Sequence, residues 1–215
     1  MSKEIVESGA AILEFDNKLC IHSRHCVLTR PDVFVPNAQG DWLHPECASA
    51  ETLLHIAKNC PSGAIVVKRK DGGEQEAAPK VNTVRVLENG PLAFNADLTI
   101  SRTDAEPVSH LRATLCRCGQ SRNKPYCDLS HNAANFIATG EPPAQTSQPL
   151  MQRDGSLSVK PLANGPLVVQ GHLEIISGTG QTLQRGEKLF LCRCGHSANK
   201  PYCDGRHSKV GFIAA

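Results

Sequence analysis

Residues 116–131 read Cys-Arg-Cys-Gly-Gln-Ser-Arg-Asn-Lys-Pro-Tyr-Cys-Asp-Leu-Ser-His, and residues 192–207 read Cys-Arg-Cys-Gly-His-Ser-Ala-Asn-Lys-Pro-Tyr-Cys-Asp-Gly-Arg-His. Twelve of sixteen positions agree, at a constant offset of 76 residues. Each stretch offers three thiols and one imidazole in the order C-x-C-x8-C-x3-H, which predicts a duplicated metal site. The predicted metal ligands are Cys116, Cys118, Cys127 and His131 in the first copy, and Cys192, Cys194, Cys203 and His207 in the second.

The spacing of the first two cysteines favours an iron–sulfur cluster over zinc. Structural zinc sites usually have pairs spaced C-x2-C or wider, because four ligands must converge on a single ion. A two-iron cluster spreads its four ligands over two metals, so Cys116 and Cys118 can hold one iron while Cys127 and His131 hold the other. A zinc-stabilised knuckle is the alternative interpretation.

The repeat extends beyond the cysteines. Asn89-Gly-Pro-Leu recurs as Asn164-Gly-Pro-Leu, and Asn135-Phe-Ile-Ala recurs as Gly211-Phe-Ile-Ala. Two similar halves on one chain suggest a pseudo-twofold pair.

Short apolar and β-branched runs predict that each half is built from strands rather than helices. Turns of the type Asn-Gly-Pro separate the runs, and a further strand in each half, 113–116 and 189–192, should deliver the first cysteine. The other predicted strands begin at Thr83, Leu92 and Leu98 in the first half, and at Leu157, Leu167 and Leu173 in the second.

Both stretches resemble CDGSH iron–sulfur domains (mitoNEET-like). Beyond the ligands, the family pattern is met by Ser121, Pro125 and Asp128, and by Ser197, Pro201 and Asp204. The chain departs from it at Leu129, where the family has glycine, and at Arg206, where the family has a small residue. The resemblance implies a small β-rich fold with one [2Fe-2S] cluster in each unit.

Further residues of the two loops are predicted to support the clusters. Asp128 and Asp204 are expected to be N-caps that place each histidine in the first turn of a short helix. The basic side chains of the loops can be solvated charges or can also donate to cluster sulfurs. The predicted cofactor-binding residues are Arg117, Ser121, Lys124, Asp128, Arg193, Ser197, Lys200 and Asp204.

The N-terminal part contains an edited ferredoxin motif. The bacterial pattern is C-x2-C-x2-C-x3-C-P with a distant Cys-Pro, whereas this chain has Cys20, Ser23, Cys26 and, further on, Cys60-Pro61. The segment resembles divergent single-cluster ferredoxins, including a helix over 49–59 with Ser49 as its N-cap. Cys20, Cys26 and Cys60 are therefore predicted metal ligands. Three thiolates with serine at the fourth position favour a [3Fe-4S] cluster; a [4Fe-4S] cluster with a non-cysteine ligand and a cluster-free core are the alternatives.

The expected fold class is α+β. Residues 1–70 are expected to form a divergent ferredoxin-like domain, followed by two β-rich CDGSH-type units at 82–138 and 156–215. Polar segments at 71–80 and 140–149 are expected to connect them.

The predicted function follows from the ligands. Replacing a thiolate by a neutral imidazole removes a negative charge and raises the cluster potential, so the chain is expected to carry single electrons between redox partners. The alternatives are a cluster donor for apo-acceptor proteins, a redox or iron sensor, and a zinc-holding module. Because no nucleophile with its base, phosphate loop or substrate pocket stands out, the chain is not expected to be an enzyme.

Composition limits the partners. The net charge of +2 gives no reason to expect nucleic acid or a membrane as a partner. A cytoplasmic, reducing compartment is expected, since no leader or membrane span is visible and the cysteines have metal-ligand spacing. A monomer is plausible. Cys47 is expected to be a small buried residue, Trp42 a packing residue, and His22 and His25 are given no role.

Overall fold

The computed structural model describes residues 3–101 and 105–214. It divides into two compact units, with the boundary between Ala77 and Ala78, inside the predicted connector at 71–80. Strands greatly outnumber helices in the described ranges, which confirms a β-rich α+β fold. None of the helices in these ranges has the length and apolar character required to cross a membrane.

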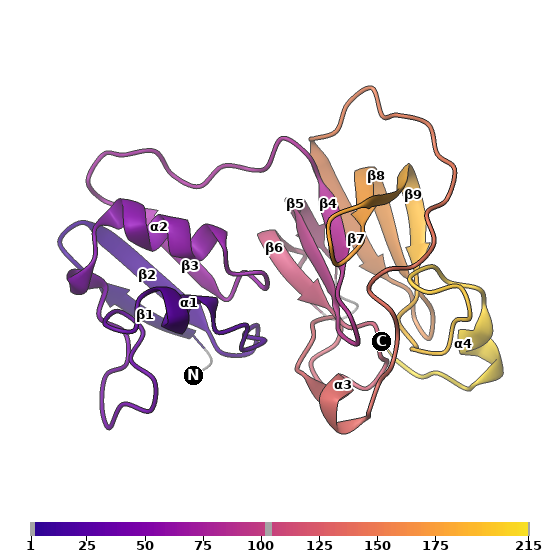
Figure 1. The fold of residues 1–215 in the computed structure, drawn as a ribbon, viewed down its shortest axis with the longest axis horizontal. Helices are drawn as coiled ribbons and strands as arrows, with labels where there is room; N and C mark the ends of the chain where they lie inside the picture. The colour runs from indigo at the N-terminus through magenta and orange to yellow at the C-terminus, as the bar shows by residue number, and fades with distance from the viewer. Residues whose placement is uncertain (1–2, 102–104, 215) are drawn as a thin grey trace. The chain divides into compact units, whose positions relative to one another are not determined.

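The N-terminal unit is a three-stranded antiparallel sheet with β2 in the middle (Figure 1). Its elements are β1 (Lys3–Glu7), β2 (Ala11–Asp16), α1 (His25–Thr29), the 3-10 turn η1 (Pro45–Cys47), α2 (Ala50–Lys58) and β3 (Ile65–Arg69). Helix α2 begins after Ser49, whose Oγ accepts a 3.2 Å hydrogen bond from the N–H of Thr52, as predicted. The apolar face of α2, including Leu53 and Ile56, joins Leu13 and Ile65 of the sheet in one core.

The C-terminal unit is one six-stranded sheet with two short helices. Its elements are β4 (Thr83–Val86), β5 (Leu92–Ile100), β6 (Val108–Leu115), α3 (Ser130–Ala133), β7 (Ser156–Pro161), β8 (Leu167–Ile176), β9 (Thr182–Leu191) and α4 (Arg206–Lys209). Alternate side chains of β5 are buried, as expected for a strand with one face in the core.

The first strand of each repeat pairs with the second strand of both repeats. Strand β4 is antiparallel to β5 and parallel to β8, whereas β7 is antiparallel to β8 and parallel to β5. Consequently β4 and β7 share the space between β5 and β8, with β6 paired to β5 and β9 paired to β8 (Figure 1). The two repeats therefore form one sheet rather than two separate ones.

Strands β5 and β8 each span two of the predicted strands. The pairing of β5 with β6 shifts register between Asn95 and Leu98, and the pairing of β8 with β9 shifts between Gln170 and Leu173. A bulge absorbs extra residues without ending the strand, so the interruptions in the sequence pattern are irregularities within one strand rather than turns. Strands β6 and β9 end just before Cys116 and Cys192, as predicted.

Candidate metal centres

The two C-x-C pairs lie where β6 and β9 end. The Sγ atoms of Cys116 and Cys118 are 3.7 Å apart, and those of Cys192 and Cys194 are also 3.7 Å apart. Two thiolates on one tetrahedral ion, each at about 2.3 Å, would be about 3.8 Å apart. Each pair therefore has the spacing of two ligands on the same metal.

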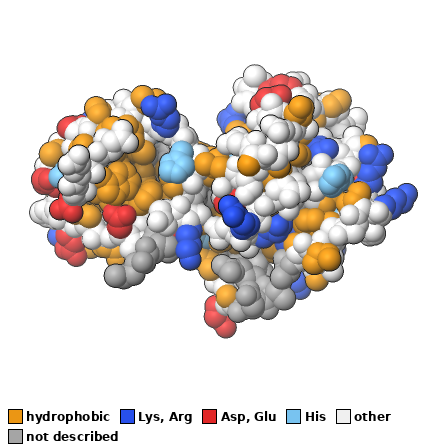
Figure 2. Space-filling view, turned by 90° about the horizontal axis from the view of Figure 1, so that it is seen from below, with side chains coloured by type: hydrophobic (Ala, Val, Ile, Leu, Met, Phe, Trp, Pro, Cys, Tyr) orange, Lys and Arg blue, Asp and Glu red, His pale blue; other side chains and the backbone are white. Residues whose placement is uncertain are grey.

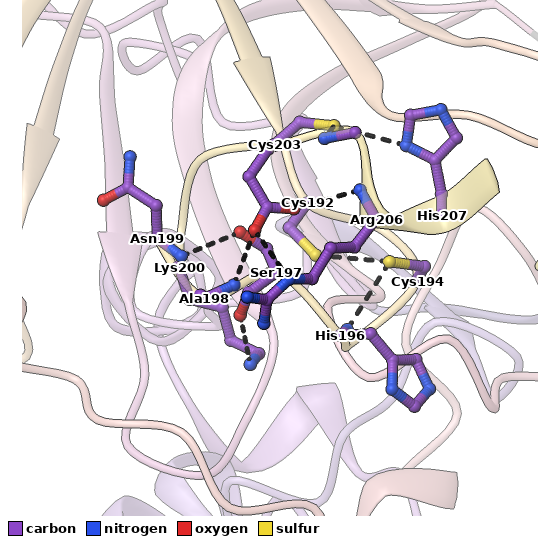
Figure 3. A network of polar contacts seen from close by, with 12 residues as sticks. Cys192, Cys194, His196, Ser197, Ala198, Asn199, Lys200, Cys203, Arg206 and His207 are labelled. Atoms are coloured by element: carbon purple, nitrogen blue, oxygen red, sulfur yellow. Dashed lines mark hydrogen bonds and ion pairs between the residues drawn. The ribbon is translucent and has the colours of Figure 1, made fainter. Parts of the chain in front are cut away.

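The histidines form a second pair in each copy. Nδ1 of His131 lies 3.5 Å from Sγ of Cys127, and Nδ1 of His207 lies 3.4 Å from Sγ of Cys203. A thiolate and an imidazole on one tetrahedral ion would be about 3.5 Å apart, given typical bond lengths of about 2.3 and 2.0 Å. Figure 3 shows the second copy, with Cys192 beside Cys194 and His207 facing Cys203. The donor set thus consists of two pairs, which fits a cluster of two irons.

Within residues 3–101 and 105–214, no three His, Cys, Asp or Glu side chains gather closely enough to hold a single metal ion.

Backbone N–H groups point at the thiols of both copies. Each of the four bonds measures 3.4 Å, and the donors are Gln120 and Leu129 in the first copy, and His196 and Gly205 in the second. Such bonds stabilise a thiolate and raise the potential of a cluster that it holds.

The protonation of the first-copy thiols reflects their burial and pairing. The hydrogen bond from Cys118 lowers the pKa of Cys116 to about 6, whereas burial raises the pKa of Cys127 to about 11. A buried thiolate at Cys127 is costly unless a cation offsets its charge, which suits a metal centre.

The predicted serine and aspartate residues shape the ligand loop. Oγ of Ser121 donates to the carbonyl of Tyr126 at 2.7 Å, and the carboxylate of Asp128 accepts from the N–H groups of Arg122 and Ser130. Ser197 and Asp204 have the equivalent bonds in the second copy.

The predicted N-caps are one residue too early. Residues Leu129 and Gly205, both in the left-handed region, directly precede α3 and α4. The Asp128 and Asp204 carboxylates nevertheless accept from the first helical N–H group, so they still contribute to the helix start.

Arg117 is neither solvated nor bonded to sulfur in the structure. Its side chain is buried, with the residue 1% exposed, and it lies 5.4 Å from the ring of Phe136. Alternate side chains of an extended chain point to opposite sides, so the residue between Cys116 and Cys118 points away from their thiols. Its guanidinium donates to the carbonyls of Gly90, Thr139, Leu87 and Ala138 at 2.9, 3.1, 2.6 and 3.1 Å.

The second copy repeats this arrangement. Arg193 donates to the carbonyls of Leu162, Gly165 and Ala214, and its guanidinium lies 5.5 Å from the ring of Phe212. In each copy the repeated Asn-Gly-Pro-Leu and Phe-Ile-Ala segments supply one partner each, Gly90 and Ala138 in the first and Gly165 and Ala214 in the second, a role that sequence reasoning missed. The recurrence of both segments on either side of the ligand loop was the signal.

The loop lysines also bind backbone. Nζ of Lys124 donates to the carbonyl of Ser121, and Nζ of Lys200 donates to that of Ser197 at 2.7 Å. Their predicted contact with cluster sulfur stays a prediction.

The two ligand loops touch each other through glycines. Gly119 has a φ of +82°, and a Cβ added there would lie 2.6 Å from the carbonyl oxygen of Cys194. Gly195, with a φ of +84°, approaches the carbonyl oxygen of Cys118 in the same way. Burial lowers the pKa of Arg117 to about 10, an effect that the thiolate of Cys192 opposes from the other copy. The ligand loops of the two candidate centres are therefore in direct contact.

The three N-terminal cysteines line one cavity. It has a volume of about 290 Å³, and Cys20, Cys26 and Cys60 are in its wall together with Ser23 and Trp42. Burial raises the pKa of Cys20 and Cys26, and the charge of Cys60 raises both further. Three thiols in the wall of one cavity suit a cluster.

The structure brings His22 into the same site. Its Nδ1 lies 3.8 Å from Sγ of Cys20, and its backbone N–H donates to that sulfur at 3.4 Å. The side chain lines the cavity. Sequence reasoning gave His22 no role, because a histidine in a loop is usually solvated.

Cys47 was predicted to be buried and Trp42 to be a packing residue. Cys47 is exposed, contrary to the prediction, because Pro45 takes the buried position of the 3-10 turn. Trp42 packs edge-to-face on Phe15 with ring centroids 4.7 Å apart, and its Nε1 donates to Glu4 at 3.0 Å.

Comparison with known families agrees with this arrangement. Residues 89–132 and 164–208 match the family described as iron-binding zinc finger CDGSH type. Residues 7–70 match the family described as divergent 4Fe-4S mono-cluster. A comparison with curated proteins finds no match. The two family matches confirm the resemblances drawn from the sequence: two segments that match the CDGSH type follow one that matches the divergent 4Fe-4S mono-cluster type.

Proposed function

We propose that this iron–sulfur protein carries single electrons between redox partners. In the proposal, each 3Cys–1His set of the C-terminal unit holds one [2Fe-2S] cluster, and the three N-terminal thiols hold a third cluster. A bound cluster supplies one-electron chemistry, and a neutral histidine ligand raises its potential above that of an all-cysteine site. The chain's own residues hold the cluster, donate to its thiolates and exclude water on the buried side.

The observation that carries this proposal is the division of each ligand set into two pairs. Separations of 3.7 Å between the paired sulfurs and of 3.5 and 3.4 Å between sulfur and imidazole recur in both copies. The reciprocal pairing of β4 with β8 and of β7 with β5 supports a pseudo-twofold relation between the copies. Contact between the ligand loops supports electron exchange between the clusters.

The proposal includes a cellular setting. It places the protein in a reducing compartment such as the cytoplasm, with proteins as its partners and without catalysis on a substrate. A second candidate function, cluster donation to apo-proteins, is favoured by the Cys203 and His207 pair, which is only partly buried.

Metal and sulfide analysis tests the proposal. Anaerobically purified protein is expected to contain acid-labile sulfide and about eight irons if the third cluster is [4Fe-4S], or about seven if it is [3Fe-4S]. Paramagnetic resonance should detect the clusters on reduction, whereas zinc sites would give no signal. Folded protein that carries zinc and lacks sulfide after reconstitution would exclude the proposal.

We propose His22 as the non-cysteine ligand of a four-iron N-terminal cluster. The support is the position of His22 in the wall of the cavity that the three thiols line. In this case His22→Ala is expected to lower the iron content from about eight to about seven and to give the resonance spectrum of a three-iron cluster.

Ser23→Ala is the matched control, since Ser23 lines the same cavity. It should leave the iron content and the spectrum unchanged. The opposite result, in which Ser23→Ala removes one iron and His22→Ala does not, would assign the ligand to the serine.

A further inference from the structure

The two CDGSH centres share their backbone arrangement but differ in exposure. In the first copy, His131 is 9% exposed and Cys127 is 3% exposed. In the second copy, His207 and Cys203 are both partly exposed. The cysteine–histidine edge of the second copy is therefore more open to solvent than that of the first.

The residue directly before the helix that carries the histidine also leaves the second copy more open. Leu129 adopts a left-handed φ of 67°, so the first copy keeps a bulky side chain where a glycine would be relaxed. The second copy has Gly205 there, and a Cβ added to it would meet nothing within 4 Å. The second copy thus has open space where the first has an apolar side chain.

The charge beside the two histidines differs as well. Helix α4 carries Arg206 and Lys209, both exposed, whereas Ser130 and Ala133 are their uncharged equivalents in α3. Nε of Arg206 lies 3.4 Å from Asp204, but its side chain remains 52% exposed. Figure 2 shows blue Lys and Arg side chains on the right-hand unit, formed by residues 78–214.

The apolar surface does not distinguish the copies. Ile137 follows α3 and Ile213 follows α4, and each is 83% exposed. Exposure of the ligand edge and positive charge on the helix that carries the histidine therefore separate the two centres, whereas in the ligand loop the first copy has the exposed Arg122 and the second has Ala198.

We infer that the two centres have different roles. The cluster of the second copy, held by Cys192, Cys194, Cys203 and His207, is transferred to a recipient, and the cluster of the first copy is retained. The recipient is an apo-protein with free cysteine thiols. This inference rests on the proposed binding of [2Fe-2S] clusters.

The transfer is a ligand exchange that leaves the cluster intact. The cluster leaves with both irons and both sulfides, and its four bonds to this chain are replaced by four bonds to the recipient. No electron is exchanged. Protons from the recipient's thiols pass to the thiolates released here and to the imidazole or solvent, so the charge balances.

The positive charge assists the approach of the recipient. Reactive cysteines are thiolates, and thiolates are attracted by cations within the screening length of about 10 Å at 0.1 M salt. Arg206 and Lys209 lie one residue before and two residues after His207, so an anionic recipient meets them at the open edge.

Cluster loss from the complete, loaded protein tests the inference. With excess EDTA, the visible absorbance of the two [2Fe-2S] clusters is expected to fall in a fast and a slow phase of equal amplitude, to which loss of the N-terminal cluster adds a separate phase. Since a thiolate is a firmer ligand than imidazole, His207→Cys should remove the fast phase, whereas His131→Cys should leave it in place. The same pattern is expected for transfer to an apo-ferredoxin.

Two further variants separate the effect of exposure from that of charge. Leu129→Gly opens the first copy and should accelerate the slow phase. The double variant Arg206→Ser with Lys209→Ala removes the positive charge of α4 and should slow the fast phase at low salt only. A single phase for the two [2Fe-2S] clusters of the unaltered protein, or loss of the fast phase in His131→Cys alone, would overturn the inference. Protein without labile sulfide would instead exclude the proposed function before any rate is measured.

Discussion

Replacing Gly119 with alanine is expected to lower the free energy of unfolding of the C-terminal unit by about 2–5 kcal/mol. Gly119 has a φ of +82°, which costs an alanine about 1–2 kcal/mol. The new Cβ would also lie 2.6 Å from the carbonyl oxygen of Cys194, and this backbone atom cannot move without disturbing the ligand loop of the other copy. Both clusters should consequently be lost more readily.

Gly205→Ala is the control for backbone strain alone. Gly205 has a φ of +83°, but a Cβ there meets nothing within 4 Å. Its variant is expected to lose only about 1–2 kcal/mol. Urea unfolding followed by circular dichroism, together with visible absorbance of the clusters, measures both effects. If the two variants lose the same stability, the contact between the ligand loops contributes nothing.

The ligand sets could be predicted from the sequence because their physics is local. Only one residue separates Cys116 from Cys118, so the C-x-C spacing already keeps both thiols close together, and their Sγ atoms are 3.7 Å apart. The capping hydroxyl of Ser49 is equally local. Two groups that are only a few residues apart can form a hydrogen bond in few backbone conformations, so such a bond can be predicted from the local sequence.

The arrangement of the sheet depends on contacts between distant residues. Whether β4 pairs with β8 as well as with β5 is decided by packing across the two copies, and nothing in the four residues of β4 specifies it. His22 was missed for a related reason. Its distance from Cys20 depends on the left-handed backbone at His22 itself, which a non-glycine residue rarely adopts.

Replacing Arg117 with lysine is expected to lower the free energy of unfolding of the C-terminal unit by about 3 kcal/mol. The guanidinium donates to four carbonyls, from the turn before β5 and from the segment after α3. An ammonium group is a point donor without the planar fork, so it cannot reach all four and leaves buried carbonyls without a partner. The first-copy ligand loop should then lose its cluster faster.

Arg122→Lys is the matched control, because Arg122 lies in the same loop with an exposed side chain. Surface substitutions of this kind usually change stability by less than about 0.5 kcal/mol. The two variants differ only in burial and in the carbonyl contacts, so the difference between their unfolding free energies isolates the contribution of the buried fork. Equal stability of the two would mean that Arg117 does not anchor the ligand loop. The carbonyl contacts would then be a consequence of burial rather than a requirement of the site.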